Sequence, residues 1–387
     1  MPSEGTVRPL RLVYAVTLCQ FAAMGMFFTG IQLYVEDELD GSKAAVGLAV
    51  GAFSITAVLV RPNVGRGVGR RGRKPFLVVG LALLTLSSLG FLVADAIAVV
   101  VVLRLVQGIS GACVYTVVAS MVTDFAPLEK RASAIARMSL FQYAGIALGP
   151  TVAALLIDHG GFTEVWLLAA ALGVIGLVAT ARLPESGTTV MTRRAEVGRR
   201  RRRVLHPAAV GPGLVLLAGG IGYSSVTGFG SLFARHVGIG AGTLYAAFAV
   251  TVIGVRLVSG ELADARGAAG VALPGLALAG AGLGVLAAVQ RPVAALIGVV
   301  VFGLGFALVF PALLAFTVGR APDHERGEAV GSFTAFLDVG MGGGAYLIGA
   351  IADAFGFRAA YAVPAAVCVA GAVLLGVIAR TPAPADP

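Results

Sequence analysis

The chain has 387 residues, of which 58% are hydrophobic and only 13% are charged. This balance excludes an ordinary soluble protein, because so apolar a chain would have to expose a large hydrophobic surface to water. The formal net charge of +9 is compatible with a nucleic-acid-binding protein. We favour a membrane protein, because the cations fall in alternate short loops between apolar runs instead of forming one basic face.

Twelve membrane-spanning helices are predicted from apolar runs of about 20 residues that recur along the chain. Lipid-exposed backbone must satisfy its own hydrogen bonds, and these runs are too long for barrel strands, so the predicted fold class is an all-α membrane protein. The predicted spans are residues 10–34, 44–64, 76–94, 97–122, 132–157, 163–181, 209–233, 241–262, 270–289, 292–318, 328–352 and 359–379.

The positions of the Lys and Arg residues predict the topology. If the N-terminus is cytoplasmic, 24 of them lie on the cytoplasmic side and four lie outside, at Lys43, Arg235, Arg291 and Arg358. Such an excess of cations marks the cytoplasmic side, so we expect both termini there. The first span lacks the short core and cleavage site of a signal peptide. The composition is typical of a GC-rich bacterium, so the expected location is the bacterial cytoplasmic (inner) membrane.

Residues 182–208 interrupt the apolar pattern and are predicted to link an N-terminal six-helix half, residues 1–181, to a C-terminal half, residues 209–387. The linker holds Arg193, Arg194 and five consecutive arginines at 199–203. A run of five arginines can bind nucleic acid. Between two membrane halves, we favour a cytoplasmic linker that anchors the topology and contacts anionic lipid headgroups.

The loop from Arg61 to Pro75 carries six cations and no acid. We expect the second span to end near Pro62 and a tight, close-packed turn to follow from Gly65 to Gly72.

An offset of 195 residues reveals a second copy of this region. Each copy has six spans, an even number, so the two copies form a parallel repeat. Matched pairs are Arg61 and Arg256, Gly65 and Gly260, Gly72 and Gly267, Gly108 and Gly303, Arg131 and Arg326, and Gly161 and Gly356.

The segment from Gly65 to Lys74, which reads GRGVGRRGRK, resembles the signature loop of the major facilitator superfamily of transporters. The resemblance implies a substrate site between the halves and alternating access. In that family an Asp in the loop helps to latch the cytoplasmic side; Gly69 stands there, and Asp124 is a candidate substitute. The predicted cytoplasmic gate comprises Arg61, Gly65, Arg70, Arg71, Gly72, Arg73, Lys74, Asp124, Arg131, Arg256, Asp264 and Arg326.

Two charged residues are predicted deep within the spans. Arg104, in the sequence LRLVQG, is similar to the span-4 motif of the superfamily, whose Arg has been tied to proton coupling, and the match includes Gln107 and Gly108. Asp338 lies about ten residues into span 11. A structural Arg bonded to backbone carbonyls, and an acid capped at a glycine-rich helix break, are the alternatives. We favour a proton-coupling pair, because charges at this depth are costly.

Gly145, Gly149 and Pro150 in span 5 resemble the Gly-x-x-x-Gly-Pro core of the antiporter motif of drug-efflux members, although Ala153 and Ala154 stand where that motif has glycines. Packing through small residues explains the pattern equally well. The side chains expected to line a weakly polar, amphipathic cavity, with interhelix packing as the alternative for each, are Gln20, Met24, Phe28, Gln107, Tyr115, Gln142, Tyr143, Tyr223, Tyr245, Phe310 and Phe336.

Signals for soluble enzymes are absent from the sequence, which has no phosphate-binding Gly-Lys-Ser/Thr loop and no His-Glu-x-x-His. The three cysteines lie far apart in apolar runs, and the four histidines lie in or beside loops, where we expect them to be solvated. We therefore predict no catalytic residue, metal or cofactor. The predicted function is proton-coupled efflux of small amphipathic molecules, either drug-like or metabolic, by a monomer. An uptake symporter and a non-transporting membrane sensor are the alternatives; short tails disfavour the sensor.

Overall fold

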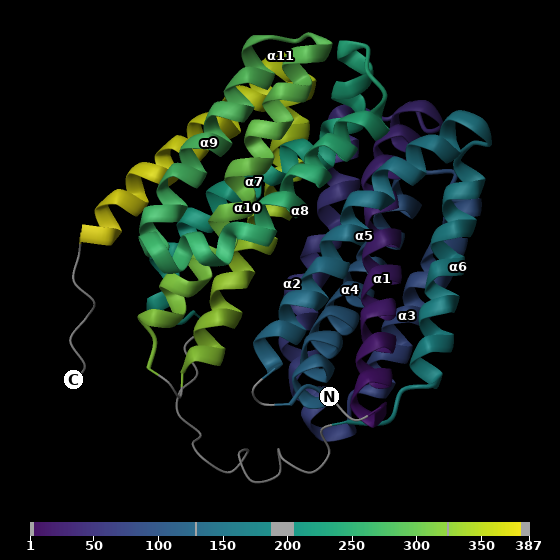
Figure 1. Cartoon of the computed structure of the whole chain (residues 1–387). Helices are drawn as coiled ribbons and strands as arrows, with labels where there is room; N and C mark the ends of the chain where they lie inside the picture. The colour runs from purple at the N-terminus through teal and green to yellow at the C-terminus, as the bar shows by residue number, and fades with distance from the viewer. Residues whose placement is uncertain (1–3, 128–129, 187–204, 323–324, 381–387) are drawn as a thin grey trace. The chain divides into compact units, whose positions relative to one another are not determined.

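The computed structural model describes residues 4–127, 130–186, 205–322 and 325–380, and these ranges are almost entirely helical, with no β-strand (Figure 1). This confirms the predicted all-α class. The elements are α1 (Glu4–Asp37), α2 (Lys43–Arg71), α3 (Lys74–Gly90), the short 3-10 helix η1 (Phe91–Val93), α4 (Ile97–Phe125), α5 (Arg131–His159), α6 (Phe162–Ala181), α7 (Pro207–Val237), α8 (Ala241–Arg266), α9 (Ala268–Ala288), α10 (Pro292–Gly319) and α11 (Arg326–Arg380).

The last element, α11, consists of two helical segments that meet at Gly356, whose φ is 75° and ψ −179°. With α11 counted as two, the described residues contain twelve α-helical segments, which match the twelve predicted spans in order. Within the described ranges, ten stretches are long and apolar enough to cross a membrane, with α11 counted once, and α8 adds a shorter apolar stretch, Ala241–Arg256.

The predicted end of the second span near Pro62 is wrong, because α2 continues to Arg71. A proline removes one backbone donor, and helices in membranes tolerate this where other groups satisfy the freed carbonyl. Gly65 is exposed, and a Cβ there would meet nothing within 4 Å. The close turn is therefore confined to Gly72, which has a φ of 82°.

The chain divides into two compact units, the first formed by Met1–Asp40 and Ala52–Arg201 and the second by Gly41–Gly51 and Arg202–Pro387. The predicted linker falls largely on residues 187–204, outside the described ranges, so its bounds stay a prediction. The repeat is visible in the backbone of each unit. Gly72 and Gly267 have φ angles of 82° and 72°, and Gly161 and Gly356 have 99° and 75°. Each matched pair adopts a left-handed conformation that favours glycine.

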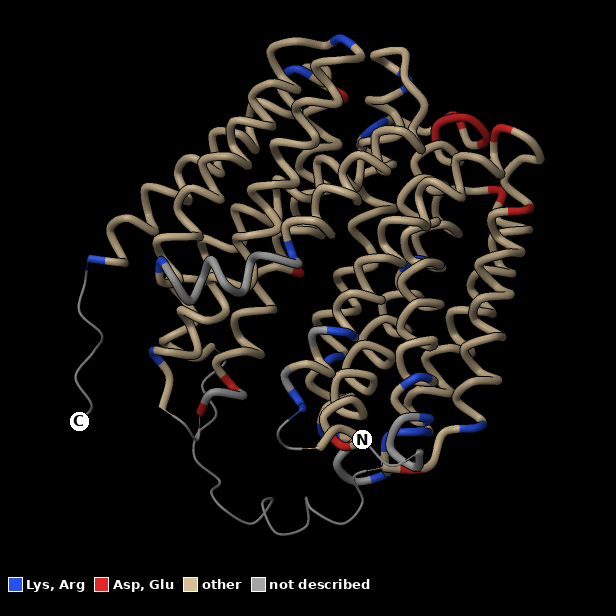
Figure 2. Tube along the Cα trace, viewed as in Figure 1, with Lys and Arg blue, Asp and Glu red and all other residues tan. Residues whose placement is uncertain are grey.

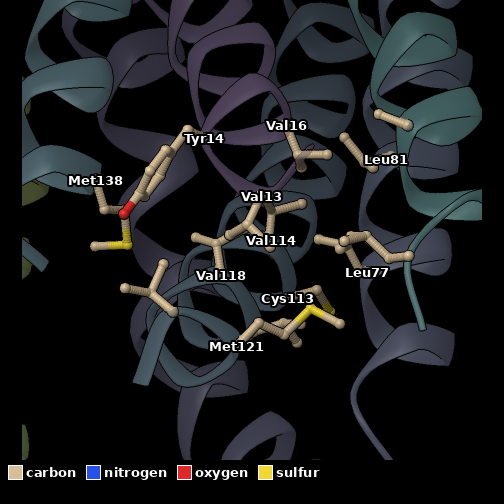
Figure 3. Close-up of a cluster of buried hydrophobic side chains, with 14 of the residues drawn as sticks. Val13, Tyr14, Val16, Leu77, Leu81, Cys113, Val114, Val118, Met121 and Met138 are labelled. Carbon is tan, nitrogen blue, oxygen red and sulfur yellow. The ribbon is translucent and has the colours of Figure 1, made fainter. Parts of the chain in front are cut away.

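The core of the first unit lies between α1, α3 and α4 (Figure 3). In this unit α1 packs against α4, α5 and α6, and α3 packs against α4 and α6. The side chains are mostly β-branched or long aliphatic ones that fill the space between helices without leaving polar atoms unpaired. Residues that are fully or nearly fully buried in this cluster include Val13, Val16, Leu77, Leu81, Val114, Val118 and Met121.

The core of the second unit is built in the same way from the later helices. Here α7 packs against α10 and α11, α9 packs against α10 and α11, and α8 packs against α10. Val215 and Leu216 of α7, Leu276 of α9, Leu313 of α10 and Phe333 of α11 are fully buried together.

Large apolar side chains cover the outer faces of the helices. Leu59 is 67% exposed, Val250 is 72% exposed and Phe355 is 75% exposed. In water such an apolar surface would promote aggregation, whereas in a membrane it can contact the apolar lipid tails. In the first unit, Lys and Arg gather at the end that holds the turn between α2 and α3, and Asp and Glu gather at the opposite end (Figure 2). An apolar band between two charged ends is typical of a membrane-spanning bundle.

The acidic end of the first unit contains an aromatic cluster around Trp166, which is 1% exposed. Its ring stacks on Phe91 and Phe27, with centroids 4.7 and 5.3 Å away, and meets the Tyr34 ring edge-on at 5.6 Å. A Cβ on Gly30 would lie 2.9 Å from the Trp166 ring, so the glycine makes room for the indole. The cluster joins the ends of α1 and α6 to η1.

Candidate functional site

Arg104 lies within α4 and is 2% exposed. Its Nη1 donates to Gln107 Oε1 at 2.8 Å, and its guanidinium carbon lies 5.0 Å from the centre of the Phe53 ring. Residues three apart share a helix face, so α4 itself supplies the amide partner. The ring face of Phe53 in α2 attracts the cation. The structure thus surrounds the buried charge with a polar group and an aromatic group from its own unit.

The crossing of α2 and α4 places Phe53 beside Arg104. A Cβ on Gly108 would overlap the carbonyl oxygen of Phe53 and the hydroxyl of Thr56, so only glycine permits this approach. The Thr56 hydroxyl donates across the crossing to the carbonyl oxygen of Leu105 at 2.6 Å. The crossing is therefore held by backbone contact and by an interhelical hydrogen bond.

Asp338 lies on α11, partly buried, twelve residues after the start of the helix at Arg326. At about 1.5 Å per residue this places it roughly 18 Å along the helix. The glycine-rich stretch after it remains helical, so a cap at a helix break does not describe Asp338. A Cβ on Gly340 would lie 2.6 Å from the carbonyl oxygen of Leu217, so this part of α11 packs closely on α7.

The predicted motif in α5 packs against α1. A Cβ on Gly145 would lie 2.7 Å from the backbone nitrogen of Ala22, and one on Gly149 would overlap the carbonyl oxygen of Ala22. The carbonyl oxygen of Pro150 accepts a hydrogen bond from Thr29 Oγ1 at 3.3 Å. These contacts give the glycines and the proline a packing role within the first unit.

The predicted cavity residues of the first unit are buried to different degrees. Gln20 and Phe28 are buried, and the partly buried ones are Met24, Tyr115, Gln142 and Tyr143. Tyr115 meets Phe21 edge-on at 6.2 Å, and the guanidinium of Arg61 lies 5.5 Å from the centre of the Tyr115 ring. The structure therefore brings one predicted gate residue to one predicted cavity residue.

The predicted cavity residues of the second unit contact neighbours inside that unit. The Tyr245 hydroxyl donates to the carbonyl oxygen of Thr227 at 3.2 Å, which packs α8 on α7. The Phe336 ring fills the position that a Cβ on Gly213 would occupy. Tyr223 stacks on Phe306 at 4.6 Å, and Phe310 lies 5.8 Å from Phe333.

Among the predicted gate residues, Arg73 and Asp124 form an ion pair, with side chains 12% and 25% exposed. The structure thus brings the candidate substitute acid to one of the six cations. Arg71 and Arg131 are exposed, and Arg61 and Arg256 are partly buried. The side chains of Arg70, Asp264 and Arg326 lie outside the described part of the chain.

Sequence reasoning missed Glu185, which lies just after α6. Its Oε1 accepts hydrogen bonds from the backbone nitrogens of Arg73 at 2.7 Å and Lys74 at 3.2 Å. Lys74 Nζ in turn donates to the carbonyl oxygens of Ala181 and Leu183, both at 2.9 Å. The signal in the sequence was an acid directly after Pro184, where the sixth predicted span gives way to the arginine-rich linker.

The expectation that all four histidines are solvated is wrong for His206, which is 5% exposed. Its Nε2 lies 2.9 Å from Glu325 Oε2, and its backbone nitrogen donates to Ser332 Oγ at 3.0 Å. Its Nδ1 accepts from the backbone nitrogen of Ala208 at 3.2 Å, which caps α7. A residue followed by proline at the first helical position is a known N-cap pattern, and it could have predicted this role.

No group of three or more His, Cys, Asp or Glu among the described residues could hold a metal ion. Cys19, Cys113 and Cys368 are free and buried.

Two repeated bundles of apolar helices form the parallel-repeat architecture that is found in many membrane transporters. The model of the Major Facilitator Superfamily matches residues 13–345 and 241–387. The chain therefore belongs to the major facilitator superfamily, and it is a multi-pass membrane transporter of small molecules.

Relatives and solved structures agree with this assignment. The chain is 28% identical over 382 residues to an uncharacterized MFS-type transporter of Salmonella typhimurium, covering 95% of this chain and 96% of the relative. It is 30% identical over 390 residues to an uncharacterized MFS-type transporter of Burkholderia mallei, covering 97% of this chain and 94% of the relative. The fold is similar to the nucleoside transporter NupG, with a TM-score of 0.77, 13% identity and coverage of 96% and 99%. It is also similar to the human organic anion transporter MFSD10, with a TM-score of 0.72, 17% identity, and coverage of 97% of this chain and 100% of that chain.

Proposed function

We propose that this transporter exports small amphipathic molecules in exchange for protons, with Arg104 and Asp338 as the coupling residues. The observation that carries the proposal is the burial of Arg104 within an apolar helix, where insertion of a cation costs a few kcal/mol. The guanidinium donates to the Gln107 amide and lies against the Phe53 ring, and both groups can exchange partners.

Asp338 is the proposed proton carrier. A carboxyl group in an apolar setting loses its desolvation cost when it takes up a proton, and regains a charge only when a cation or a polar ligand compensates it. Binding of a proton and binding of substrate then exclude each other. Each must leave before the other binds, and this competition gives exchange. The continuous helix around Asp338 supports this role, because no exposed helix end is present there for the acid to cap.

The proposed substrate class follows from the side chains predicted to line the cavity. They are aromatic, thioether and amide groups, which suit a ligand with an apolar body and few hydrogen-bonding groups. A sugar phosphate would call for a cluster of basic side chains. The proposed orientation places both termini in the cytoplasm of a bacterium and the protein in its inner membrane, acting as a monomer. The separation of basic and acidic ends in the first unit supports this orientation.

The test is transport by purified protein in proteoliposomes with an imposed pH gradient, with ethidium and rhodamine 6G as probes. Flux is expressed per folded molecule, counted from the monodisperse fraction after reconstitution. Asp338→Asn should reduce gradient-driven flux to background, because the amide cannot carry a proton. Arg104→Lys should shift the pH optimum of flux.

Asp158→Asn is the matched control, because Asp158 is an exposed acid at the end of α5. Its flux should equal that of the parent protein. Normal gradient-driven flux per molecule for Asp338→Asn would remove Asp338 from the mechanism. Probe movement in the same direction as the protons would identify an uptake symporter instead of an exporter.

A further inference from the structure

The start of α3 is capped by a carboxylate from the segment that follows α6. The first N–H groups of a helix have no partner within it, and the segment Arg61–Pro75 has no acid of its own to supply one. Glu185 Oε1 fills this position by accepting hydrogen bonds from the backbone nitrogens of Arg73 and Lys74 at 2.7 and 3.2 Å. The negative charge also lies at the positive end of the α3 dipole, where it is stabilising.

The end of α6 is capped in return by a cation from α3. Lys74 Nζ donates to the carbonyl oxygens of Ala181 and Leu183, each at 2.9 Å. The last carbonyls of a helix lack partners within it, and a lysine at this end complements the dipole. The two helix ends therefore cap each other through one acid and one base.

The turn between α2 and α3 closes directly on this carboxylate. Gly72 has a φ of 82°, and a Cβ there would lie 2.9 Å from Glu185 Cδ. The next side chain, Arg73, forms the ion pair with Asp124 at the end of α4. The turn is thus fastened to the ends of two other helices of the first unit, α4 and α6.

We infer that Glu185 and Lys74 form a clasp that sets the position of the turn between α2 and α3, and that Glu185 is a positioning residue of the transport cycle. Glu185 lies four residues after the end of α6 at Ala181. The clasp ties the end of α6 to the basic loop.

The second unit shows that the fold itself does not require this clasp. The repeat matches Lys74 with Ala269 and Glu185 with Arg380, neither of which can form it. Leu183 matches Ile378, and the carbonyl oxygen of Ile378 accepts from Arg320 Nη2 at 3.2 Å. The same carbonyl position is therefore capped in both halves, by Lys74 beside the turn in the first half and by Arg320 after α10 in the second half.

The test uses a cysteine at position 186, because Ser186 is 7% exposed and the three native cysteines are buried. Ser186→Cys protein in nanodiscs is labelled with a water-soluble maleimide, without substrate or pH gradient. The labelling rate follows the population of the opened form. Adding Glu185→Ala should raise the rate about tenfold, the factor expected from loss of a helix cap. Glu185→Gln keeps an acceptor oxygen and should stay within about twofold of the parent.

Lys74→Ala should raise the labelling rate as Glu185→Ala does, and the double variant should add nothing further, because both changes open one clasp. Glu328→Ala, which removes an exposed acid at the start of α11, is the matched control and should leave the rate unchanged. Rates equal to the parent in both single variants, or two increases that multiply in the double variant, would overturn the clasp. If Glu185→Ala yields no folded protein, Lys74→Ala and Glu185→Gln carry the test. The readout needs no transport, so it stands apart from the test of Asp338.

Discussion

In the first half, α2 and α4 cross at Gly108; in the second half, α8 and α10 cross at Gly303, its match in the repeat. Phe53 and Thr56 lie opposite Gly108, and their matches, Phe248 and Thr251, lie opposite Gly303. The neighbouring residues differ. Arg104 and Gln107 form a polar pair in the first half. Their matches are Val299 and Phe302, and the Phe302 ring lies 5.9 Å from Phe248 and 5.7 Å from Phe306.

The difference teaches how one duplicated scaffold holds two kinds of interior. The glycine and the Phe-Thr pair fix the crossing in both halves, and the residues one turn away decide whether a charge or an aromatic stack lies beside it. The first crossing is also the tighter one. A Cβ would overlap backbone at Gly108, whereas at Gly303 it would meet only side chains, at 3.2 Å and beyond. A rigid crossing suits a buried cation, whose partners must keep their places.

The largest expected effect breaks the tighter crossing. Gly108→Ala should lower the free energy of unfolding by about 3 kcal/mol, because the new methyl group must displace the carbonyl of Phe53. Gly303→Ala should cost about 1 kcal/mol or less, because the Phe248 and Thr251 side chains can yield by a few tenths of an ångström. Thermal unfolding of the two purified variants in the same detergent measures the difference. Equal losses of stability would mean that the two crossings are equally tight.

A smaller effect separates the roles of the two interiors. Phe302→Leu should cost about 1–2 kcal/mol of stability through its lost ring contacts, with flux per folded molecule unchanged. Gln107→Leu should cost about 1–3 kcal/mol of stability, because it removes an acceptor from a buried charged donor, and it should also reduce flux per folded molecule, because Arg104 loses the amide that orients it. Flux and unfolding are measured on the same preparations. A flux defect in the Phe302 variant alone would reverse the comparison.

The smallest effect concerns the two threonines. The Thr56 hydroxyl bonds across to α4, whereas the Thr251 hydroxyl donates to Ala247 in its own helix at 2.8 Å. Interhelical hydrogen bonds in membrane proteins contribute about 0.6 kcal/mol on average and rarely more than about 1.7. Thr56→Val should therefore destabilise by about 1 kcal/mol and Thr251→Val by close to zero. Chemical unfolding with matched baselines resolves this difference, and a larger loss for the Thr251 variant would contradict it.

Much of the fold was predictable because apolar runs and loop charges act locally. The offset of 195 residues predicted which glycines are equivalent, and Gly72 with Gly267 and Gly161 with Gly356 share left-handed conformations. Helix ends were less predictable. Pro62 suggested a helix end, but α2 continues past it. A proline destabilises a membrane helix only to the extent that neighbouring groups leave the freed backbone carbonyl without a hydrogen bond.

The candidate site was predictable where one helix carries it. Arg104 and Gln107 are three residues apart, so their contact follows from helix geometry. Glu185 and His206 could not be assigned in the same way, because their partners lie 111 to 126 residues away in the sequence. A sequence pattern shows that such a residue is polar and near a helix end. It does not show which other helix end approaches it.

The aromatic cluster around Trp166 gives the protein a built-in optical reporter. Trp166 is the single tryptophan of the chain, so indole emission arises from the first half alone. Its dry setting against Phe27, Phe91 and Tyr34 implies blue-shifted emission in the folded state and a red shift when water reaches the ring. The second half has no tryptophan, and its matching position holds Tyr361. Fluorescence can therefore show whether the two halves of the transporter unfold together or one after the other.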